Sequence, residues 1–317
     1  MLKIYQTILG LDFQALPDAP TWNSDVKAFR VLDHKTGDLI GQFYMDLFPR
    51  DGKYGHAANF GLISGYEKET GEYVLPISSV VANFSKPTKD DPGLLTHDEV
   101  ETLFHEFGHV MHHVLSRTRN GSFSGTSVKR DFVEAPSQMM ENWVWEKSIL
   151  KDLTSHYKTG ESMPSDLLDR LLRTRHFNQG IFYTRQIFYA SIDMAYHTLK
   201  NIRHLDVTQM YHKFYHDICM MKALKGTRPE ASFDHLMGGY DAGYYGYLWS
   251  KVYATDMYTR FEAEGLLNPE TGNEYRRTIL EQGGSQDPMK LVSDFLKRKP
   301  NNEAFLRLIK ENSVAAH

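Results

Sequence analysis

The sequence predicts an α+β fold that is mainly α-helical and carries one small, mostly antiparallel β-sheet. Before residue 90, runs of strand-forming residues alternate with short polar turns. From residue 96 onwards, apolar residues recur at the i, i+3, i+4 spacing of helices that bury one stripe. We therefore expect the 317 residues to form a single domain, with a sheet-containing region at 1–90 and a mostly helical region at 91–317.

Two hairpins are predicted in the first region. The turn D-H-K-T-G-D at 33–38 separates two runs of strand-forming residues, and E-K-E-T-G-E at 67–72 repeats the arrangement. A cluster of Pro, Asp and Gly between Pro87 and Gly93 then breaks the pattern. A strand just upstream of the first long helix can leave an open edge, along which an extended peptide could pair through main-chain hydrogen bonds.

Composition argues against several classes of partner. The formal net charge of −4 leaves no basic footprint, so neither nucleic acid nor a membrane is expected as a partner. Nowhere do about 18 apolar residues run together, and the apolar run at the N-terminus is too short for a signal peptide. The single cysteine, Cys219, excludes an internal disulfide framework and suits a reducing compartment. The sequence therefore predicts a cytoplasmic protein.

The stretch from Thr96 to Ser116 predicts the first long helix. Thr96 and Glu99 form a T-x-x-E capping box, which places the start of the helix at Asp98 or just before it. Eight apolar side chains then follow at helical spacing and define one buried stripe.

This predicted helix contains His105, Glu106 and His109 in the order H-E-x-x-H. At about 100° per residue the two histidines lie roughly 40° apart around the helix, so both imidazoles can face one ion. Glu106 projects beside them and is placed to act as a general base on a metal-bound water, as is typical of this zinc motif. The weaker interpretation is that both histidines make only ordinary structural hydrogen bonds on a helix face, because chance matches to the pattern are rare.

A third ligand must come from further along the chain, since a catalytic zinc ion takes three protein ligands and keeps one position open. The extended form H-E-x-x-H-x-x-G-x-x-H is absent, because His112 and Leu115 occupy two of its fixed positions. Glu134 is favoured, since it lies at the start of a predicted helix in which Pro136 can occupy the first turn. Two later carboxylates stay open as alternatives, Glu141 and Glu146.

The segment from His235 to Trp249 contains four tyrosines and four glycines and is predicted to be a flexible loop with phenol tips. A tyrosine near its ordinary pKa of about 10 is protonated at neutral pH and can donate a hydrogen bond to an oxyanion on a peptide carbonyl. The glycines would let the loop close on a substrate. Tyrosines packed in a core explain the pattern equally well from sequence alone.

Several long motifs resemble the thimet oligopeptidase and neurolysin family of zinc peptidases. They are H-E-F-G-H-V-M-H, F-S-G-T, R-D-F-V-E-A-P-S-Q with E-N-W, D-G-K-Y-G-H-A-A and V-A-N-F-S-K-P. The likeness covers nearly the whole chain and implies a zincin-like catalytic domain. Carried over position by position, it makes His105, His109 and Glu134 the ligands of one Zn²⁺ ion and Glu106 the catalytic base.

The same resemblance gives roles to the tyrosine-rich segment. It implies that His235, Tyr240, Tyr244 and Tyr247 contact the substrate or the transition state. We expect Tyr244 and Tyr247, with His235, to assist catalysis, and Tyr240 and Gly239 to bind the substrate.

Carboxylates that orient the ligating imidazoles are expected behind the ligands. Glu101, one turn before His105, and Glu141 are the candidates. For Glu101 an ordinary surface contact within the helix is an equally good interpretation.

We therefore expect a zinc-dependent endopeptidase that hydrolyses short oligopeptides. One alternative is a peptidyl-dipeptidase that releases dipeptides from C-termini, as in related enzymes. Another is a peptide-binding or assembly partner that does not turn peptides over.

Members of the family that this sequence resembles are typically about twice as long as this sequence. Their N-terminal helical half forms the opposite wall of a deep channel, and the present sequence begins where that half ends. We expect the surface that would contact such a half to be unusually apolar. This predicts self-association, or a partner that covers the surface.

Overall fold

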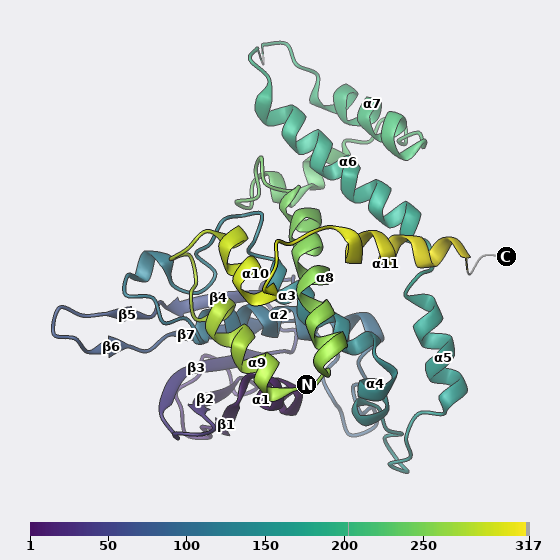
Figure 1. Cartoon of the computed structure of the whole chain (residues 1–317). Helices are drawn as coiled ribbons and strands as arrows, with labels where there is room; N and C mark the ends of the chain where they lie inside the picture. Colours follow the sequence, from purple (N-terminus) through teal and green to yellow (C-terminus); the bar gives the residue numbers. More distant parts are fainter. Residues whose placement is uncertain (202, 315–317) are drawn as a thin grey trace.

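The computed structural model describes residues 1–201 and 203–314 and is mainly helical with a small mixed sheet (Figure 1). The strands are β1 (Leu11–Ala15), β2 (Lys27–Asp33), β3 (Leu39–Asp46), β4 (Ala58–Ile63), β5 (Tyr66–Glu67), β6 (Tyr73–Val74) and β7 (Ile77–Val81). The α-helices are α1 (Leu2–Leu9), α2 (His97–Val114), α3 (Ala135–Met140), α4 (Lys147–Leu153), α5 (Ser165–Thr174), α6 (Gln179–Thr198), α7 (Val207–Cys219), α8 (Gly246–Glu264), α9 (Pro269–Tyr275), α10 (Pro288–Leu296) and α11 (Glu303–Val314). The shorter helices are η1 (Gly121–Phe123), η2 (Glu141–Trp145), η3 (Pro229–Ser232), η4 (Asp234–Leu236) and the π-helical η5 (Arg276–Leu280).

The main sheet has the strand order β1-β2-β3-β7-β4. Both predicted hairpins form: β2 pairs with β3, and β4 pairs antiparallel with β7, the small β5–β6 hairpin lying in their connection. The sequence did not predict that β7 lies parallel to β3, with Ser78 beside Phe43. Because the second hairpin joins the sheet through β7, the sheet is mixed and β4 is its outermost strand on that side.

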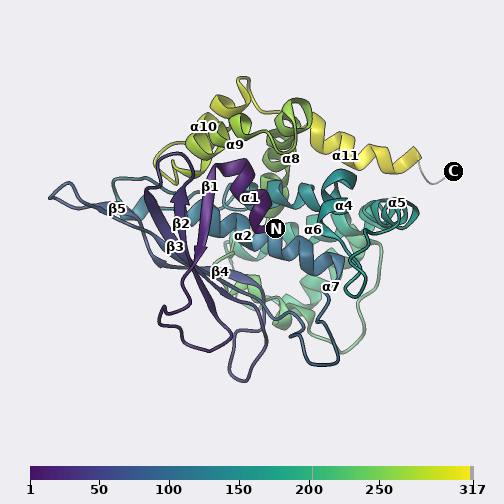
Figure 2. The same ribbon diagram turned by 90° about the horizontal axis from the view of Figure 1, so that it is seen from below.

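Helix α2 packs against the sheet at the centre of the main core, as the view from below shows (Figure 2). The ring of Phe107 meets those of Phe43 and Phe13 edge-on, with centroids 5.1 and 5.7 Å apart. The predicted capping box is present, because the Thr96 hydroxyl accepts from the Glu99 amide and the Glu99 carboxylate accepts from the Thr96 amide. The apolar stripe of α2 is thus buried while its N-terminus is fixed.

Helix α3 approaches α2 very closely at Gly108. A Cβ atom on Gly108 would lie 2.8 Å from the Cα of Ser137, so only glycine fits between the two backbones. Helix α8 covers α3 from the other side, and Trp143 packs edge-on between Tyr258 and Phe261 of α8. Helix α3 is therefore packed between α2, which carries the H-E-x-x-H motif, and α8.

The tyrosine-rich segment was predicted to be a loop as far as Trp249, but its last residues are helical. Helix α8 begins at Gly246, so Tyr247 and Trp249 are helical. Sequence periodicity did not reveal this helix because its buried side chains lie all around its axis and include polar ones such as Ser250 and Asp256. A phenol on a packed helix is held more rigidly than one on a loop.

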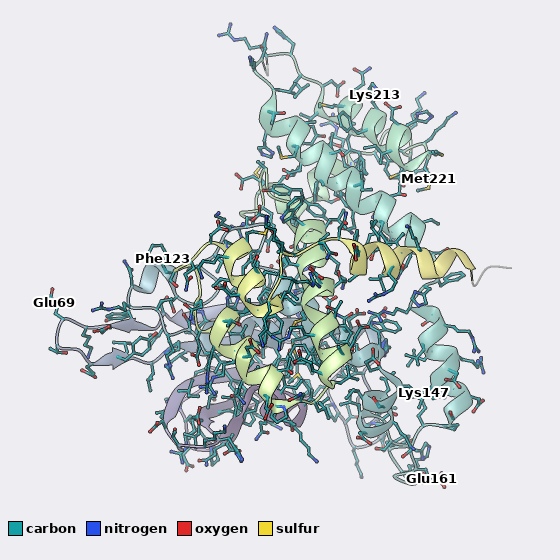
Figure 3. All side chains as sticks on the ribbon, viewed as in Figure 1. Glu69, Phe123, Lys147, Glu161, Lys213 and Met221 are labelled. Carbon is teal, nitrogen blue, oxygen red and sulfur yellow. The ribbon has the colours of Figure 1, made fainter. Side chains whose placement is uncertain are left out.

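Helices α6 and α7 project from the body of the protein and enclose a second, smaller core (Figure 1). This core is aromatic and includes Phe188, Tyr211 and Tyr244. Met221, just after α7, lies on the right-hand side of this lobe (Figure 3). Among the described residues, no helix is long and apolar enough to cross a membrane.

Several large apolar side chains are exposed on and before α6. Phe177 is 78% exposed, Ile181 59% and Phe182 55%. Such a row is unusual on a surface that faces only water.

Candidate active site

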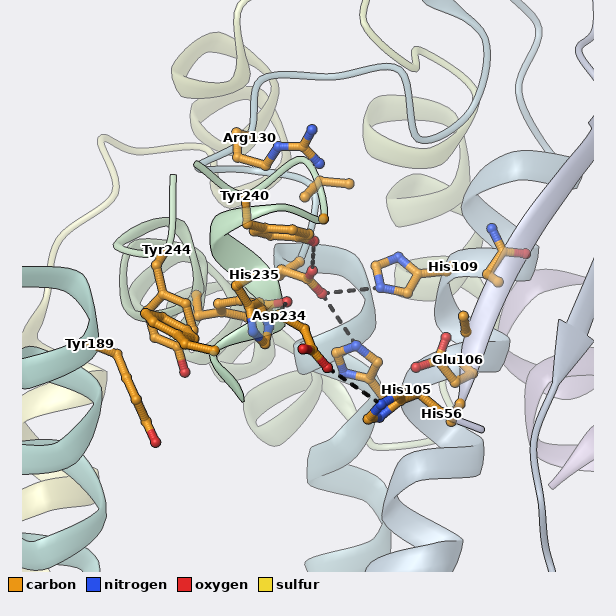
Figure 4. A pocket seen from close by; sticks show the side chains of 18 of the residues that line it. His56, His105, Glu106, His109, Arg130, Tyr189, Asp234, His235, Tyr240 and Tyr244 are labelled. Atoms are coloured by element: carbon orange, nitrogen blue, oxygen red, sulfur yellow. Dashed lines mark hydrogen bonds and ion pairs between the residues drawn. The ribbon is translucent and has the colours of Figure 1, made fainter. Parts of the chain in front are cut away.

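The three predicted metal ligands meet at one point. The Nε2 atoms of His105 and His109 lie 3.2 and 3.0 Å from the same oxygen, Oε2 of Glu134 (Figure 4). The potential ligand atoms of the three residues all lie within 4.8 Å of one another. The arrangement therefore brings two imidazoles and one carboxylate to the same small volume.

Glu134 is held at this point by its local structure. It precedes α3, whose first turn contains Pro136 as predicted, and it is only 3% exposed. The Ser137 hydroxyl donates to the Glu134 carbonyl at 2.9 Å, and the Tyr240 hydroxyl donates to the carboxylate oxygen Oε1. Oxygen Oε2 is thereby left to face the two histidines.

Charges inside this cluster compensate one another. Burial by itself would raise the pKa of Glu134, but the neighbouring His109 and His105 outweigh it and hold that pKa well below its usual value. Burial by itself would lower the pKa of His105, but its contacts with Glu134 and Glu141 hold that pKa well above its usual value. The buried carboxylate thus stays ionised and ready to bind a cation.

The alternative carboxylates are engaged elsewhere. Glu141 lies behind His105, and its Oε1 is 2.7 Å from His105 Nδ1. Glu146 accepts a hydrogen bond from the Tyr258 hydroxyl at 2.9 Å. Neither takes the position that Glu134 occupies.

In the part of the chain that the structure describes, Glu101, the other residue expected to orient an imidazole, shares no side-chain hydrogen bond or ion pair with His105. Among the described residues, its hydrogen-bond donor is the indole of Trp145, at 3.0 Å. Burial and the nearby Glu141 raise the pKa of Glu101. Although Glu101 and His105 are one turn apart on α2, the Glu101 side chain turns toward η2 because Trp145 offers it a partner there.

Glu106 borders the cleft together with both histidines. Its side chain lies near those of His105 and His109 (Figure 4), and it is not part of the cluster of potential ligands. The described structure thus leaves Glu106 outside the group of ligands and next to the space in front of them.

Tyrosines and a histidine face this cluster from across the cleft. The Tyr240 ring stacks on that of Tyr247, with centroids 5.0 Å apart and planes at 9°. The Tyr247 hydroxyl lies 3.3 Å from His235 Nε2. Burial, and after it the negative charge of Glu134, raise the pKa of Tyr247 well above its usual value. The phenol therefore keeps its proton and can act as a donor.

Tyr244 lies further back than its predicted role requires. Its hydroxyl donates to Gln186 on α6 at 3.0 Å, and its ring belongs to the second core. Burial raises its pKa to about 12. Gly239, expected to bind substrate, has φ +83°, a conformation that other residues rarely adopt.

The carboxylate of Asp193 fixes the turn between these tyrosines. It is fully buried in α6 and accepts hydrogen bonds from the amides of Ala242 and Tyr244 at 2.9 and 3.0 Å. His197 Nδ1 lies 2.9 Å from Oδ1, the oxygen that accepts from the Ala242 amide. The tyrosine-rich segment is therefore tied to α6 rather than free.

The three proposed ligands and Glu106 line one cleft of about 860 Å³ together with His235, Tyr240, Tyr244 and Tyr247. Of the two adjacent glycines, Gly238 is part of this lining and Gly239 is not.

The lining of the cleft also includes residues to which no role was given from sequence, among them His56, Arg130, Arg185 and Tyr189. The guanidinium of Arg130 lies 4.6 Å from the centre of the Tyr240 ring. Its position four residues before Glu134 is the feature of the sequence that could have identified it as a cleft residue. His56 belongs to the G-H-A-A motif and lies 3.9 Å from Asp234 across the cleft.

The segment that carries His56 is anchored by a buried lysine to the ends of β3 and β7. The ammonium of Lys53 donates to the main-chain oxygens of Asp46, Phe48 and Ala82 and is only 3% exposed. A single side chain thus fixes the course of the chain into β4, whose residues 58 and 59 also line the cleft.

Comparison with known proteins gives consistent matches over almost the whole chain. Residues 1–311 match Peptidase family M3. The chain is 44% identical over 312 residues to a thimet-like oligopeptidase of Dictyostelium discoideum, which covers 98% of the chain and 46% of that protein. It is 43% identical over 317 residues to saccharolysin of Saccharomyces cerevisiae, which covers 97% of the chain and 44% of that protein. The chain therefore spans less than half the length of these curated relatives.

Among solved structures, the fold is similar to that of PZ peptidase A with inhibitor 2. The TM-score is 0.54 at 16% sequence identity, over 84% of this chain and 42% of the other. At this identity the likeness concerns the fold alone. Taken with the match over residues 1–311, the identities to curated relatives show that the chain belongs to peptidase family M3.

Proposed function

We propose that the chain carries a zincin-like active site and hydrolyses peptide bonds within short oligopeptides with the aid of zinc. The observation that carries this proposal is the convergence of His105 and His109 on one oxygen of Glu134. Membership of peptidase family M3 supports peptides as the class of substrate.

The residues present fit a zinc ion. Two histidines and one glutamate form a known catalytic donor set, and their ligand atoms are close enough to share one ion. Glu141 occupies Nδ1 of His105, which leaves Nε2 for the metal. When bound, a zinc ion would polarise the peptide carbonyl and lower the pKa of the attacking water.

Glu106 is assigned the role of general base. It borders the cleft beside His105 without belonging to the ligand cluster. From this position its carboxylate can accept the proton of the attacking water and pass it to the leaving amine.

Tyr247 and His235 are assigned to the oxyanion that forms on the carbonyl. Burial keeps the Tyr247 phenol protonated, and its neighbour His235 lies 3.3 Å away. Preformed donors of this kind stabilise developing charge without reorganisation. Tyr244, whose hydroxyl is bonded to Gln186, supports the tyrosine-rich segment in this scheme.

The substrate would lie between β4 and the tyrosine-rich segment. Ala58 and Asn59 of this outermost strand line the same cleft as Tyr240. An extended peptide could add to the strand edge through its main chain. Gly239 and Tyr240 would contact it from the opposite side.

Hydrolysis of an internally quenched fluorescent peptide tests the proposal. We expect cleavage that needs zinc, stops with a chelator and falls by at least about 10²-fold in Glu106→Gln, because general base catalysis contributes that much. The matched control is Glu69→Gln at the exposed tip of the β5–β6 hairpin (Figure 3), which should leave activity unchanged. Cleavage that survives the chelator, or full activity in Glu106→Gln, contradicts the mechanism.

Product masses separate the proposal from its alternatives. An endopeptidase cleaves a peptide and its C-terminally amidated form at the same internal bonds. A peptidyl-dipeptidase releases dipeptides and slows when the terminus is amidated. Tight binding without any product would indicate a peptide-binding partner.

We further propose that the exposed apolar row around Phe177, Ile181 and Phe182 is covered in the working protein, by a second copy or by a partner. Light scattering at micromolar concentration tests the first case. A monodisperse monomer that is fully active argues against both. A cytoplasmic location and a single-domain organisation stay predictions.

A further inference from the structure

Lys251 lies behind the candidate metal site and is almost enclosed, with its side chain 17% exposed. It belongs to α8, one helical turn after Tyr247. Its ammonium lies 2.7 Å from Oε2 of Glu141. The other oxygen of that carboxylate, Oε1, lies 2.7 Å from Nδ1 of His105. A continuous chain of contacts thus runs from α8 through η2 to a proposed zinc ligand on α2.

Each end of the Glu141 carboxylate has a separate partner. A carboxylate bound through one oxygen can rotate about its own axis, whereas one bound at both oxygens cannot do so without losing a contact. Glu141 is itself only 15% exposed, so water cannot readily replace a lost partner. Its orientation therefore depends on Lys251 as well as on His105.

Other charged and titratable groups around Lys251 do not replace this contact. Glu101 on α2 interacts with Lys251 through space, but its hydrogen bond goes to Trp145. Tyr183 on α6 also lies within electrostatic range of the ammonium. Among the described residues, Glu141 is the group to which Lys251 donates a hydrogen bond.

We propose that Lys251 is a positioning residue for the metal site, which holds Glu141 so that His105 presents Nε2 toward His109 and Glu134. The proposal rests on the zinc site proposed above. It also links both sides of the cleft, because the helix that carries Tyr247 would fix the metal ligand through Lys251. Partners of this kind behind metal ligands commonly change metal affinity about 10- to 100-fold when removed.

Zinc affinity measured without peptide is the direct test, by competition with a chromophoric chelator. We expect Lys251→Met, which keeps the stem and removes the charge, to weaken zinc binding about 10- to 100-fold. Lys251→Arg keeps the charge and should stay within a few-fold of the wild type. The control is Lys213→Met, at an exposed lysine of α7 (Figure 3) that pairs with Asp217, and it should not change zinc affinity.

A double-mutant cycle shows whether Lys251 acts through Glu141. In a Glu141→Gln background, Lys251→Met should weaken zinc binding little further. Additive losses, or wild-type affinity in Lys251→Met, overturn the proposal. Circular dichroism of the metal-free proteins checks folding, and if Lys251→Met does not fold, Lys251→Gln replaces it with the same two outcomes.

The two proposals fail in different ways. If the wild type binds no zinc, the proposed function is wrong. If the wild type binds zinc and cleaves peptide but Lys251→Met binds zinc equally well, only the role of Lys251 is wrong.

Discussion

The two walls of the cleft are built differently. The histidine wall consists of α2 and the start of α3, and it lies in the main core among phenylalanines that are fully buried. The tyrosine wall consists of residues 235–247, and it rests on the small aromatic core of α6 and α7. One wall is supported by a sheet and two helices, and the other by a projecting helix pair and the first turn of α8 (Figure 1).

The two walls are therefore expected to serve different functions. A metal site needs ligands fixed to within a fraction of an ångström, which a dense core provides. The tyrosine wall rests on a smaller core, and the carboxylate of Asp193 holds its turn through the amides of Ala242 and Tyr244. We therefore expect changes in the histidine wall to alter metal binding, and changes in the tyrosine wall to alter turnover or substrate affinity.

The largest effect is expected for Glu134→Ala in the histidine wall. It removes one of three ligands, so zinc binding at micromolar concentration and peptide cleavage should both fall below detection. Elemental analysis after gel filtration measures the metal. Glu146→Ala is the matched control, since that carboxylate is bonded to Tyr258 and should leave zinc content unchanged. Retention of stoichiometric zinc by Glu134→Ala would show that the ligand set is wrong.

The next effect belongs to the tyrosine wall. Tyr247→Phe removes a donor that burial keeps protonated, so kcat should fall by about 10²- to 10³-fold, as for other lost oxyanion donors. Zinc affinity should not change. Tyr244→Phe is the comparison, and it should lower kcat far less because the hydroxyl of Tyr244 is bonded to Gln186. Equal losses in the two variants would show that Tyr247 has no special role.

A smaller effect is expected where the histidine wall is packed most tightly. Gly108→Ala puts a Cβ atom 2.8 Å from the Cα of Ser137 and must push α3 away, which should lower the free energy of unfolding by about 1–3 kcal/mol. Because α3 follows Glu134, zinc affinity should fall too.

The control for this variant is another glycine at a helical position. At Gly180 in α6, a Cβ atom would meet no other atom within 4 Å, so Gly180→Ala should be neutral or stabilise the protein by up to about 1 kcal/mol. Urea titrations measure both variants. A Gly108→Ala protein as stable as Gly180→Ala would mean that α3 can move without cost.

The contrast between the walls also explains what the sequence could predict. Capping at Thr96, the apolar stripe of α2 and the two hairpins are encoded by neighbouring residues, and all three appear in the structure. The parallel pairing of β7 with β3 depends on how distant segments meet. Helix α8 was not predicted because side chains on all sides of it are buried, so its apolar residues do not recur with the period of a helix.

The site shows the same limit. Spacing and local helix signals favoured Glu134 over Glu141 and Glu146 as the third partner of His105 and His109. The family resemblance implied the same set, and the structure brings the three residues together. Which carboxylate lies behind His105 could not be decided by spacing, because Glu101 and Glu141 both suited it. The nearby indole of Trp145 turns Glu101 away, and the ammonium of Lys251 holds Glu141 in place. Such choices depend on partners that lie 44 and 110 residues away along the chain.

The smallest effect is expected at the anchor of the tyrosine wall. Asp193→Asn keeps the size of the side chain but removes the charge that accepts from the amides of Ala242 and Tyr244. These amides should exchange hydrogen faster, and KM should rise several-fold, since a bond to a charged acceptor contributes about 1.5–3 kcal/mol.

The substitution at Asp193 should not change metal binding. This expected difference makes the comparison of the two walls testable. Zinc affinity of Asp193→Asn should equal that of the wild type, because the histidine wall is held by the main core. Hydrogen exchange of α2 should likewise stay slow. If zinc affinity and exchange in α2 change together with the tyrosine wall, the two walls form one cooperative unit. The hydrogen bond from Tyr240 to Glu134 and the link through α8 and Lys251 are contacts that would couple them.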